Sequence, residues 1–170
     1  MVGSAAADSF GVAPSAEWIT AGVIDQGKSL TATIADILLA YQWALNPDGN
    51  PETTDDVPDV ILNSWGVPKG IFAPCDGTFG QAIANVEAAG VVTVFAAGNE
   101  GPNPQTLRQP ADNASSPLNV FAVGAVDSFL NVPAFSSRGP SYCDANQKKP
   151  ELVAPGVSIR SSTKGSAYVY

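Results

Sequence analysis

The 170-residue sequence contains no histidine. Histidine is the side chain that most often takes the proton from a serine or cysteine nucleophile, so this chain cannot itself supply that base. Histidine is also the commonest protein ligand of transition metals. The two cysteines, Cys75 and Cys143, have no partner at metal-ligand spacing, and no glycine-rich phosphate-binding motif is present. The sequence therefore predicts no metal site and no cofactor.

Positive charge is also scarce. The chain has 8 Lys and Arg residues against 16 Asp and Glu residues, which gives a net charge of −8 and a pI of about 4.2. Binding to a nucleic acid or to an anionic lipid surface requires a basic face, so we expect neither as a partner. No apolar run is long enough to span a bilayer, and the N-terminal residues lack the pattern of a signal peptide.

What is present is the composition of a globular domain with a hydrophobic core. Apolar residues make up 45% of the chain and charged residues 14%, and 16 glycines and 14 prolines punctuate it. Cys75 and Cys143 both lie in loop-like sequence. They can form a disulfide if the protein is secreted, or they can be two separate thiols, and the sequence leaves both possibilities open.

Alternating helix and strand patterns predict the fold class. Apolar residues at three- and four-residue spacing predict a helix from Ser29 or Thr31 to about Leu45, and a second helix over Thr78–Ala89. Short apolar runs predict strands over Glu17–Val23, Val60–Asn63, Val91–Ala96 and Val120–Val126. Strands that alternate with helices and are apolar on both faces indicate an α/β protein with a parallel sheet. Ligands of such proteins bind beyond the carboxyl ends of the strands.

The most informative run is VVTVFAAGNEG, from Val91 to Gly101, which places Asn99 just beyond a buried strand. A side-chain amide fixed at a strand end can donate a hydrogen bond to an oxyanion that develops during a reaction. Alternatively, Asn99 adopts left-handed backbone geometry in a turn, beside Gly98 and Gly101. The residues alone leave both interpretations open.

Ser64, Trp65 and Gly66 follow the strand predicted at Val60–Asn63. Ser64 is a candidate nucleophile by position, but it lacks both the GxSxG motif and a histidine partner. We therefore favour a backbone edge that pairs with an extended chain. A catalytic pair of carboxylates is not favoured, because the acidic residues before this strand have no apolar cover to shift a pKa. These residues are Asp55, Asp56 and Asp59.

A series of motifs runs along the whole chain: GVAPSAEW, DVILNSWG, VVTVFAAGNEGPN, FAVGAVD, FSSRGP and KPELVAPGVSIRSS. Their order and spacing resemble those of the subtilase family of serine proteases, and DVILNSWG is most similar to its bacillopeptidase F branch. The resemblance implies a three-layer α/β fold in which helices cover both faces of a mostly parallel sheet. It also implies a secreted endopeptidase that hydrolyses peptide bonds with an Asp, His and Ser triad.

The resemblance assigns roles to residues at both strand ends. Asn99 matches the asparagine of the family's oxyanion hole. Ser64, Trp65 and Gly66 match the segment whose backbone pairs with a polypeptide substrate bound as an added strand. Trp65 stands where many relatives have leucine, so we expect the adjoining subsite to differ.

The resemblance also implies the other wall of the pocket for the substrate residue before the scissile bond. Ala96, Ala97 and Gly98 match that wall, and their small side chains leave room for a large substrate group. Glu100 matches a position at the pocket rim, where a carboxylate would favour a basic or polar substrate residue, but weakly because it is solvated. Pro110 matches a proline that is cis in relatives.

Finally, the resemblance implies that the chain is the interior of a catalytic domain. In the family, the triad His and Ser lie in motifs just before the position of Met1 and just after that of Tyr170, and the Asp lies further upstream. We therefore expect an inactive chain with an incomplete sheet, without the first strands and the nucleophile helix, that is marginally folded or self-associates. The alternatives are a non-catalytic peptide-binding subtilase-like module and a gene fragment without function. The segment Gly3–Gly11 is too short for the calcium site of some relatives.

Overall fold

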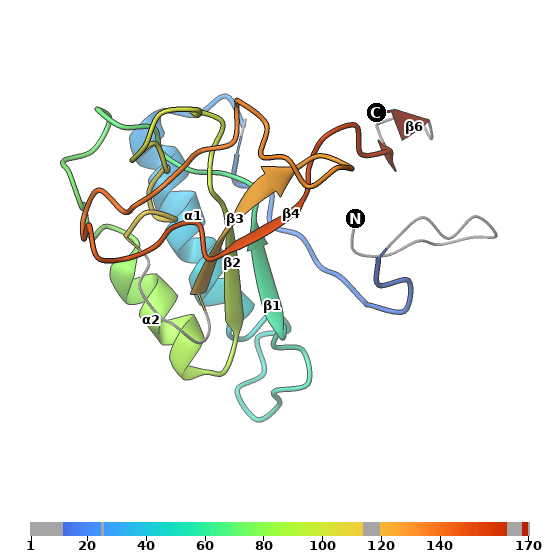
Figure 1. Cartoon of the computed structure of the whole chain (residues 1–170). Helices are drawn as coiled ribbons and strands as arrows, with labels where there is room; N and C mark the ends of the chain where they lie inside the picture. Colours follow the sequence, from blue (N-terminus) through green and yellow to red (C-terminus); the bar gives the residue numbers. More distant parts are fainter. Residues whose placement is uncertain (1–11, 25, 114–119, 163–167, 170) are drawn as a thin grey trace. The chain divides into compact units, whose positions relative to one another are not determined.

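The computed structural model describes residues 12–24, 26–113, 120–162 and 168–169 (Figure 1). The chain divides into two compact units, one of residues 23–157 and the other of residues 1–22 and 158–170. In the described part of the smaller unit, β5 (Ser161–Ser162) and β6 (Tyr168–Val169) form an antiparallel pair. The larger unit contains the helices and the main sheet.

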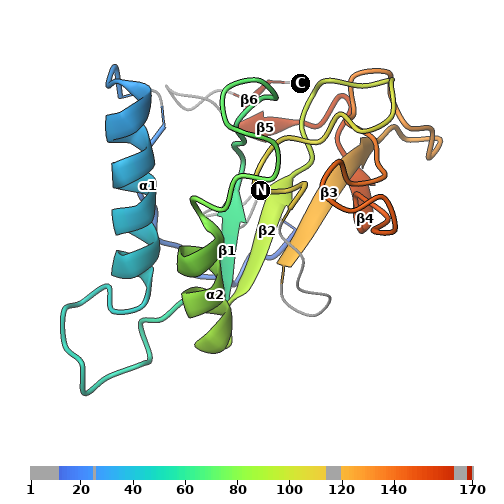
Figure 2. The same ribbon diagram turned by 90° about the vertical axis from the view of Figure 1, so that its left-hand side faces the viewer.

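The main sheet has four parallel strands in the order β1-β2-β3-β4 (Figure 2). Their bounds are Val60–Asn63 for β1, Val92–Ala96 for β2, Val120–Val126 for β3 and Leu152–Pro155 for β4. The strands predicted for β1 and β3 are confirmed with their boundaries, and β2 begins one residue later than predicted because Val91 bonds back to the end of the preceding helix, at Val86.

The strand predicted at Glu17–Val23 is wrong, because these residues form neither a strand nor a helix. An apolar run becomes a strand only where a neighbouring strand takes up its backbone hydrogen bonds. Trp18 and Ile19 are 67% and 54% exposed, so the run has no buried face, and no described strand pairs with it. Val23, which belongs to the larger unit, packs against the hydrophobic core.

α1 (Leu30–Ala44) confirms the first predicted helix. The hydroxyl of Ser29 caps it by accepting a hydrogen bond from the backbone N–H of Ala32 at 3.3 Å. Ile37 and Tyr41 lie four residues apart and are both buried. One stripe of the helix therefore faces the sheet.

α2 (Gly80–Ala88) confirms the second predicted helix but begins later than the predicted Thr78. The carboxylate of Asp76 accepts a hydrogen bond from the backbone N–H of Thr78 at 2.8 Å, which holds this residue in a turn before the helix. Gly90, with a φ of +89°, follows the helix in the left-handed conformation that ends many helices.

Both helices pack on the same face of the sheet. Phe95 of β2 is completely buried there, in a cluster that includes Ile37, Tyr41, Ile83, Val86 and Leu107. On the opposite face, Val60 and Leu62 of β1 are 52% and 59% exposed. The predicted α/β class with a parallel sheet is thus confirmed, and the described helices cover one of its two faces.

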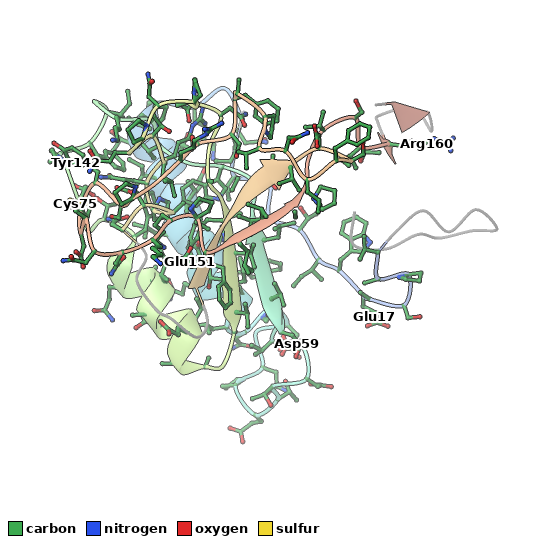
Figure 3. The ribbon with its side chains drawn as sticks, in the orientation of Figure 1. Glu17, Asp59, Cys75, Tyr142, Glu151 and Arg160 are labelled. Atoms are coloured by element: carbon green, nitrogen blue, oxygen red, sulfur yellow. A yellow bond between two sulfur atoms is a disulfide. The ribbon has the colours of Figure 1, made fainter. Side chains whose placement is uncertain are left out.

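A disulfide joins two loops of the larger unit. Cys75 and Cys143 are bonded, with Cα atoms 5.4 Å apart, which decides between the two possibilities that the sequence leaves open. Figure 3 shows Cys75 beside Tyr142, well away from Asp59, which directly precedes β1. The peptide bond before Pro110 is cis, as predicted. In the described part of the chain, the helices are too short or too polar to cross a membrane.

Candidate active site

The residues predicted for the site lie at the carboxyl ends of β1 and β2. These strands are neighbours, and the last pair of their ladder joins Asn63 to Phe95. The segments 64–66 and 96–98 therefore leave the sheet next to each other. The structure thus brings together the two segments that the resemblance identifies as pocket walls.

A third segment, which the sequence did not predict to be part of the site, bridges these strand ends. The backbone N–H of Arg108 donates to the carbonyl oxygen of Ala97 at 3.0 Å. Val67 and Gln109 exchange two backbone hydrogen bonds, of 2.7 Å and 3.1 Å. Arg108 and Gln109 are therefore fixed between the continuation of β1 and that of β2.

Asn63, the last residue of β1, is a buried side chain that connects the site to α1. Its Oδ1 accepts hydrogen bonds from the hydroxyl of Tyr41 at 2.9 Å and from the indole N–H of Trp65 at 3.1 Å. Its Nδ2 donates to the carbonyl oxygen of Val94 at 3.3 Å. Burial raises the pKa of Tyr41, so this hydroxyl remains a hydrogen-bond donor. The sequence signal for this role was a polar residue at the end of an apolar strand.

Trp65 turns its indole toward the core rather than toward solvent. Its ring lies edge-on to Phe79 and Phe95, with centroid distances of 5.1 Å and 5.9 Å. Ser64 beside it is exposed. Among the described residues, none hydrogen-bonds to the backbone of Ser64 or Trp65. This short edge therefore has backbone donors and acceptors available to an added chain.

Asn99 is exposed, and its side-chain amide has no hydrogen-bond partner within the described ranges. Its backbone N–H donates to Oε2 of Glu100 at 2.9 Å. The left-handed position in this turn belongs to Gly98, with a φ of +115°, and not to Asn99. The alternative interpretation of Asn99 as the left-handed turn residue is therefore wrong, and its amide is available to a ligand.

Glu100 is paired with Arg108. Both carboxylate oxygens lie 3.0 Å from Nε of Arg108, and Oε1 lies 2.5 Å from Nη2. Ser137 adds to the network, because its hydroxyl donates to Oε2 at 3.3 Å. Hydrogen bonds from Arg108 hold the pKa of Glu100 below its ordinary value, and those to Glu100 raise the pKa of Arg108. The rim carboxylate expected to attract basic substrate groups thus already has a cation beside it.

The arrangement can hold an extended chain and donate hydrogen bonds, but it offers no general base. The chain has no histidine, and the part of it that the structure describes contains no cluster of side chains that could hold a metal ion. These features define the class: an α/β protein with a parallel sheet, whose candidate ligand site lies at the carboxyl ends of the strands, where such proteins bind ligands.

Comparison with known proteins then identifies the family. The sequence profile of the Subtilase family matches residues 1–169, and the chain belongs to this family. The solved structure of the prenylagaramide maturation protease PagA has a similar fold, with a TM-score of 0.60 and 24% sequence identity. That match covers 84% of this chain and 44% of the other.

Several curated relatives come from bacilli. Bacillopeptidase F of Bacillus subtilis (strain 168) is 37% identical over 177 residues, which cover 99% of this chain and 11% of that protein. Serine protease AprX of the same strain is 30% identical over 94% of this chain and 36% of its own length. Subtilisin DY of Bacillus licheniformis is 34% identical over 94% of this chain and 48% of its own length. The chain thus spans less than half of each of these relatives.

Proposed function

We propose that this chain forms the oxyanion-stabilising and substrate-binding part of a secreted, subtilisin-like serine endopeptidase. Membership of the subtilase family supports the proposal. The observation that carries it is the exposed amide of Asn99 without a partner among the described residues, next to the open backbone edge of Ser64 and Trp65. The disulfide between Cys75 and Cys143 fits an oxidising, extracellular environment.

In this proposal a polypeptide substrate lies as an extended strand along residues 64–66, with residues 96–98 as the opposite wall. The Asn99 amide donates to the carbonyl oxygen that becomes negative when the peptide bond is attacked. Because β2 already fixes the backbone before Asn99, this donation requires little reorganisation in the transition state. The base that activates the nucleophile must come from outside these residues, since the chain has no histidine. The chain alone is therefore inactive.

A non-catalytic peptide-binding module is the second candidate, and the absence of histidine favours it. Such a module uses the same strand edge but binds peptides without turnover. The two candidates differ in one measurement, the release of product from a peptide by the longest natural protein that contains this chain.

Substitution of Asn99 in that protein tests the oxyanion role. Asn99→Ala should lower kcat by about 10²- to 10³-fold with little change in KM, because the amide binds the transition state more tightly than the ground state; this magnitude is the one known for the oxyanion asparagine of a subtilisin. The measurement is steady-state hydrolysis of a chromogenic peptide, with the 170-residue chain as an inactive reference.

Asn103→Ala is the matched control, because Asn103 is also exposed and lies in the following loop. It should leave both kinetic parameters unchanged. If Asn99→Ala raises KM and leaves kcat intact, Asn99 contributes to ground-state binding and the oxyanion role is excluded.

A further inference from the structure

The side chain of Arg108 lies between the two proposed pocket walls. A Cβ atom built on Gly66 would come within 2.7 Å of Cβ of Arg108 and 3.1 Å of its Cδ. On the other wall, a Cβ atom built on Gly98 would lie 3.0 Å from Cγ of Arg108. The aliphatic stem of this one residue therefore contacts both walls at once, and both contacts depend on glycine.

The guanidinium group is fixed at the same place by hydrogen bonds in two directions. Nε and Nη2 bind the carboxylate of Glu100, and Nη1 donates to the carbonyl oxygen of Gly66 at 3.3 Å. The side chains of Arg108 and Glu100 are only 31% and 36% exposed. A forked ion pair with a third anchor holds a side chain in one geometry far better than a single surface contact does.

We infer that Arg108 determines substrate specificity by filling the space between segments 64–66 and 96–98, so that the pocket accepts small, uncharged residues before the scissile bond. This inference rests on the proposed function, in which these segments are the pocket walls. The small side chains of Ala96, Ala97 and Gly98 make room that Arg108 then occupies. Large and aromatic substrate residues are excluded by volume.

The ion pair of Arg108 and Glu100 should also determine which charged substrate residues the pocket accepts. Because Arg108 and Glu100 bind each other, neither charge is presented alone to a substrate residue. Removing Arg108 both empties the pocket and frees the carboxylate of Glu100, so it should admit large residues and favour basic ones among them. Removing Glu100 as well should keep the larger volume and abolish the preference for basic residues.

The test measures kcat/KM of the longest natural protein that contains this chain on peptides that differ only in the residue before the scissile bond: Ala, Phe or Lys. The wild-type protein should prefer Ala. Arg108→Ala should raise the Phe-to-Ala ratio by about 10-fold or more, the range that pocket volume supplies, and raise the Lys-to-Ala ratio further. Arg108→Ala with Glu100→Gln should keep the gain for Phe and lose the extra gain for Lys.

Arg108→Met is the matched control, because it keeps an unbranched stem of similar length and should still exclude Phe. Arg108→Thr repeats the test with a second short side chain if the alanine variant does not fold. A wild-type preference for Phe, or a Phe-to-Ala ratio that Arg108→Ala leaves unchanged, overturns the inference.

If the proposed proteolytic function is wrong, the experiment gives a result that differs from failure of the specificity inference. If the wild-type protein cleaves none of the peptides, titration calorimetry with the same peptides replaces kcat/KM. Tighter binding of the Ala peptide than of the Phe peptide, reversed in Arg108→Ala, then supports the inference without catalysis. Equal affinities in both proteins overturn it.

Discussion

A single buried amide, Asn63, links helix α1 to the strand end that carries the candidate site. It is 4% exposed, and its Oδ1 is shared by Tyr41 of α1 and Trp65 of the proposed substrate-binding edge. Buried donors that lose their acceptor carry the full cost of desolvation, whereas loss of one of two donors to a shared acceptor costs much less. Removal of the shared acceptor, Asn63, should therefore reduce stability more than removal of one donor, the hydroxyl of Tyr41.

Asn63→Ala should lower the free energy of unfolding by about 3 kcal/mol, because it leaves the Tyr41 hydroxyl and the Trp65 indole N–H without acceptors. Tyr41→Phe should cost only about 1 kcal/mol, since Asn63 keeps Trp65 as a donor. Urea unfolding measures both, with the exposed Tyr142→Phe as a control that should be neutral. Equal losses for the two core variants would show that the shared acceptor is not what stabilises this network.

Among individual residues, the polar residues that follow the apolar strands could be predicted from the sequence. The residues that hold these strand ends in place could not. Asn99 and Glu100 lie three and four residues after the end of β2, so a local run identifies them. Arg108 contacts Gly66 across 42 positions, and no local pattern encodes that contact. Its loop reads as a polar connection, and only the folded backbone shows that it bridges β1 and β2.

At the scale of elements, the helices and the buried strands were predictable because their own residues supply the pattern. The periodicity in α1 and the capping hydroxyl of Ser29 are both local signals. The strand predicted at Glu17–Val23 does not form, because a strand needs a neighbouring strand with which to pair. An apolar run in the sequence does not show whether such a neighbouring strand exists. The disulfide could not be predicted from local sequence either, because the presence of two cysteines allows a bond but does not require one.

The disulfide should contribute strongly to the stability of the loops beyond the sheet. It joins residues 68 positions apart, and closing a loop of this length in the unfolded chain corresponds to about 4 kcal/mol. The loop around Cys143 is otherwise held by Asp112, which is 2% exposed and accepts a hydrogen bond from the backbone N–H of Tyr142 at 3.1 Å. These contacts keep the loop in place but do not constrain the unfolded state.

Replacing both cysteines by serine should therefore lower the free energy of unfolding by about 4 kcal/mol, measured by urea unfolding. The wild-type protein in reductant should unfold at nearly the same urea concentration as the double variant. The double variant itself should not respond to reductant, which is the internal control. An unfolding midpoint of the wild-type protein that reductant does not change would contradict this role.

At the scale of the whole molecule, the sheet has an apolar face and an edge that the described residues do not cover. β1 is the first strand in the order β1-β2-β3-β4, so one of its edges has no described strand beside it. Val60 and Leu62 are more than half exposed there, and Leu152 of β4 is 52% exposed. Parallel sheets are normally covered on both faces, and open apolar edges pair with other chains.

The isolated 170-residue chain should therefore self-associate, and Leu62→Lys should shift it toward monomer in sedimentation velocity over a range of concentrations. A charge at the centre of β1 adds a desolvation cost to any pairing of that edge or face, while it remains solvated in the monomer. Phe129→Lys is the matched control: Phe129 is 83% exposed but lies in a loop outside the sheet, so the substitution should leave association unchanged. The contrary result is a wild-type chain that stays monomeric at all concentrations and unfolds in one cooperative thermal transition. It would show that the exposed face of β1 is stable in water and does not drive association.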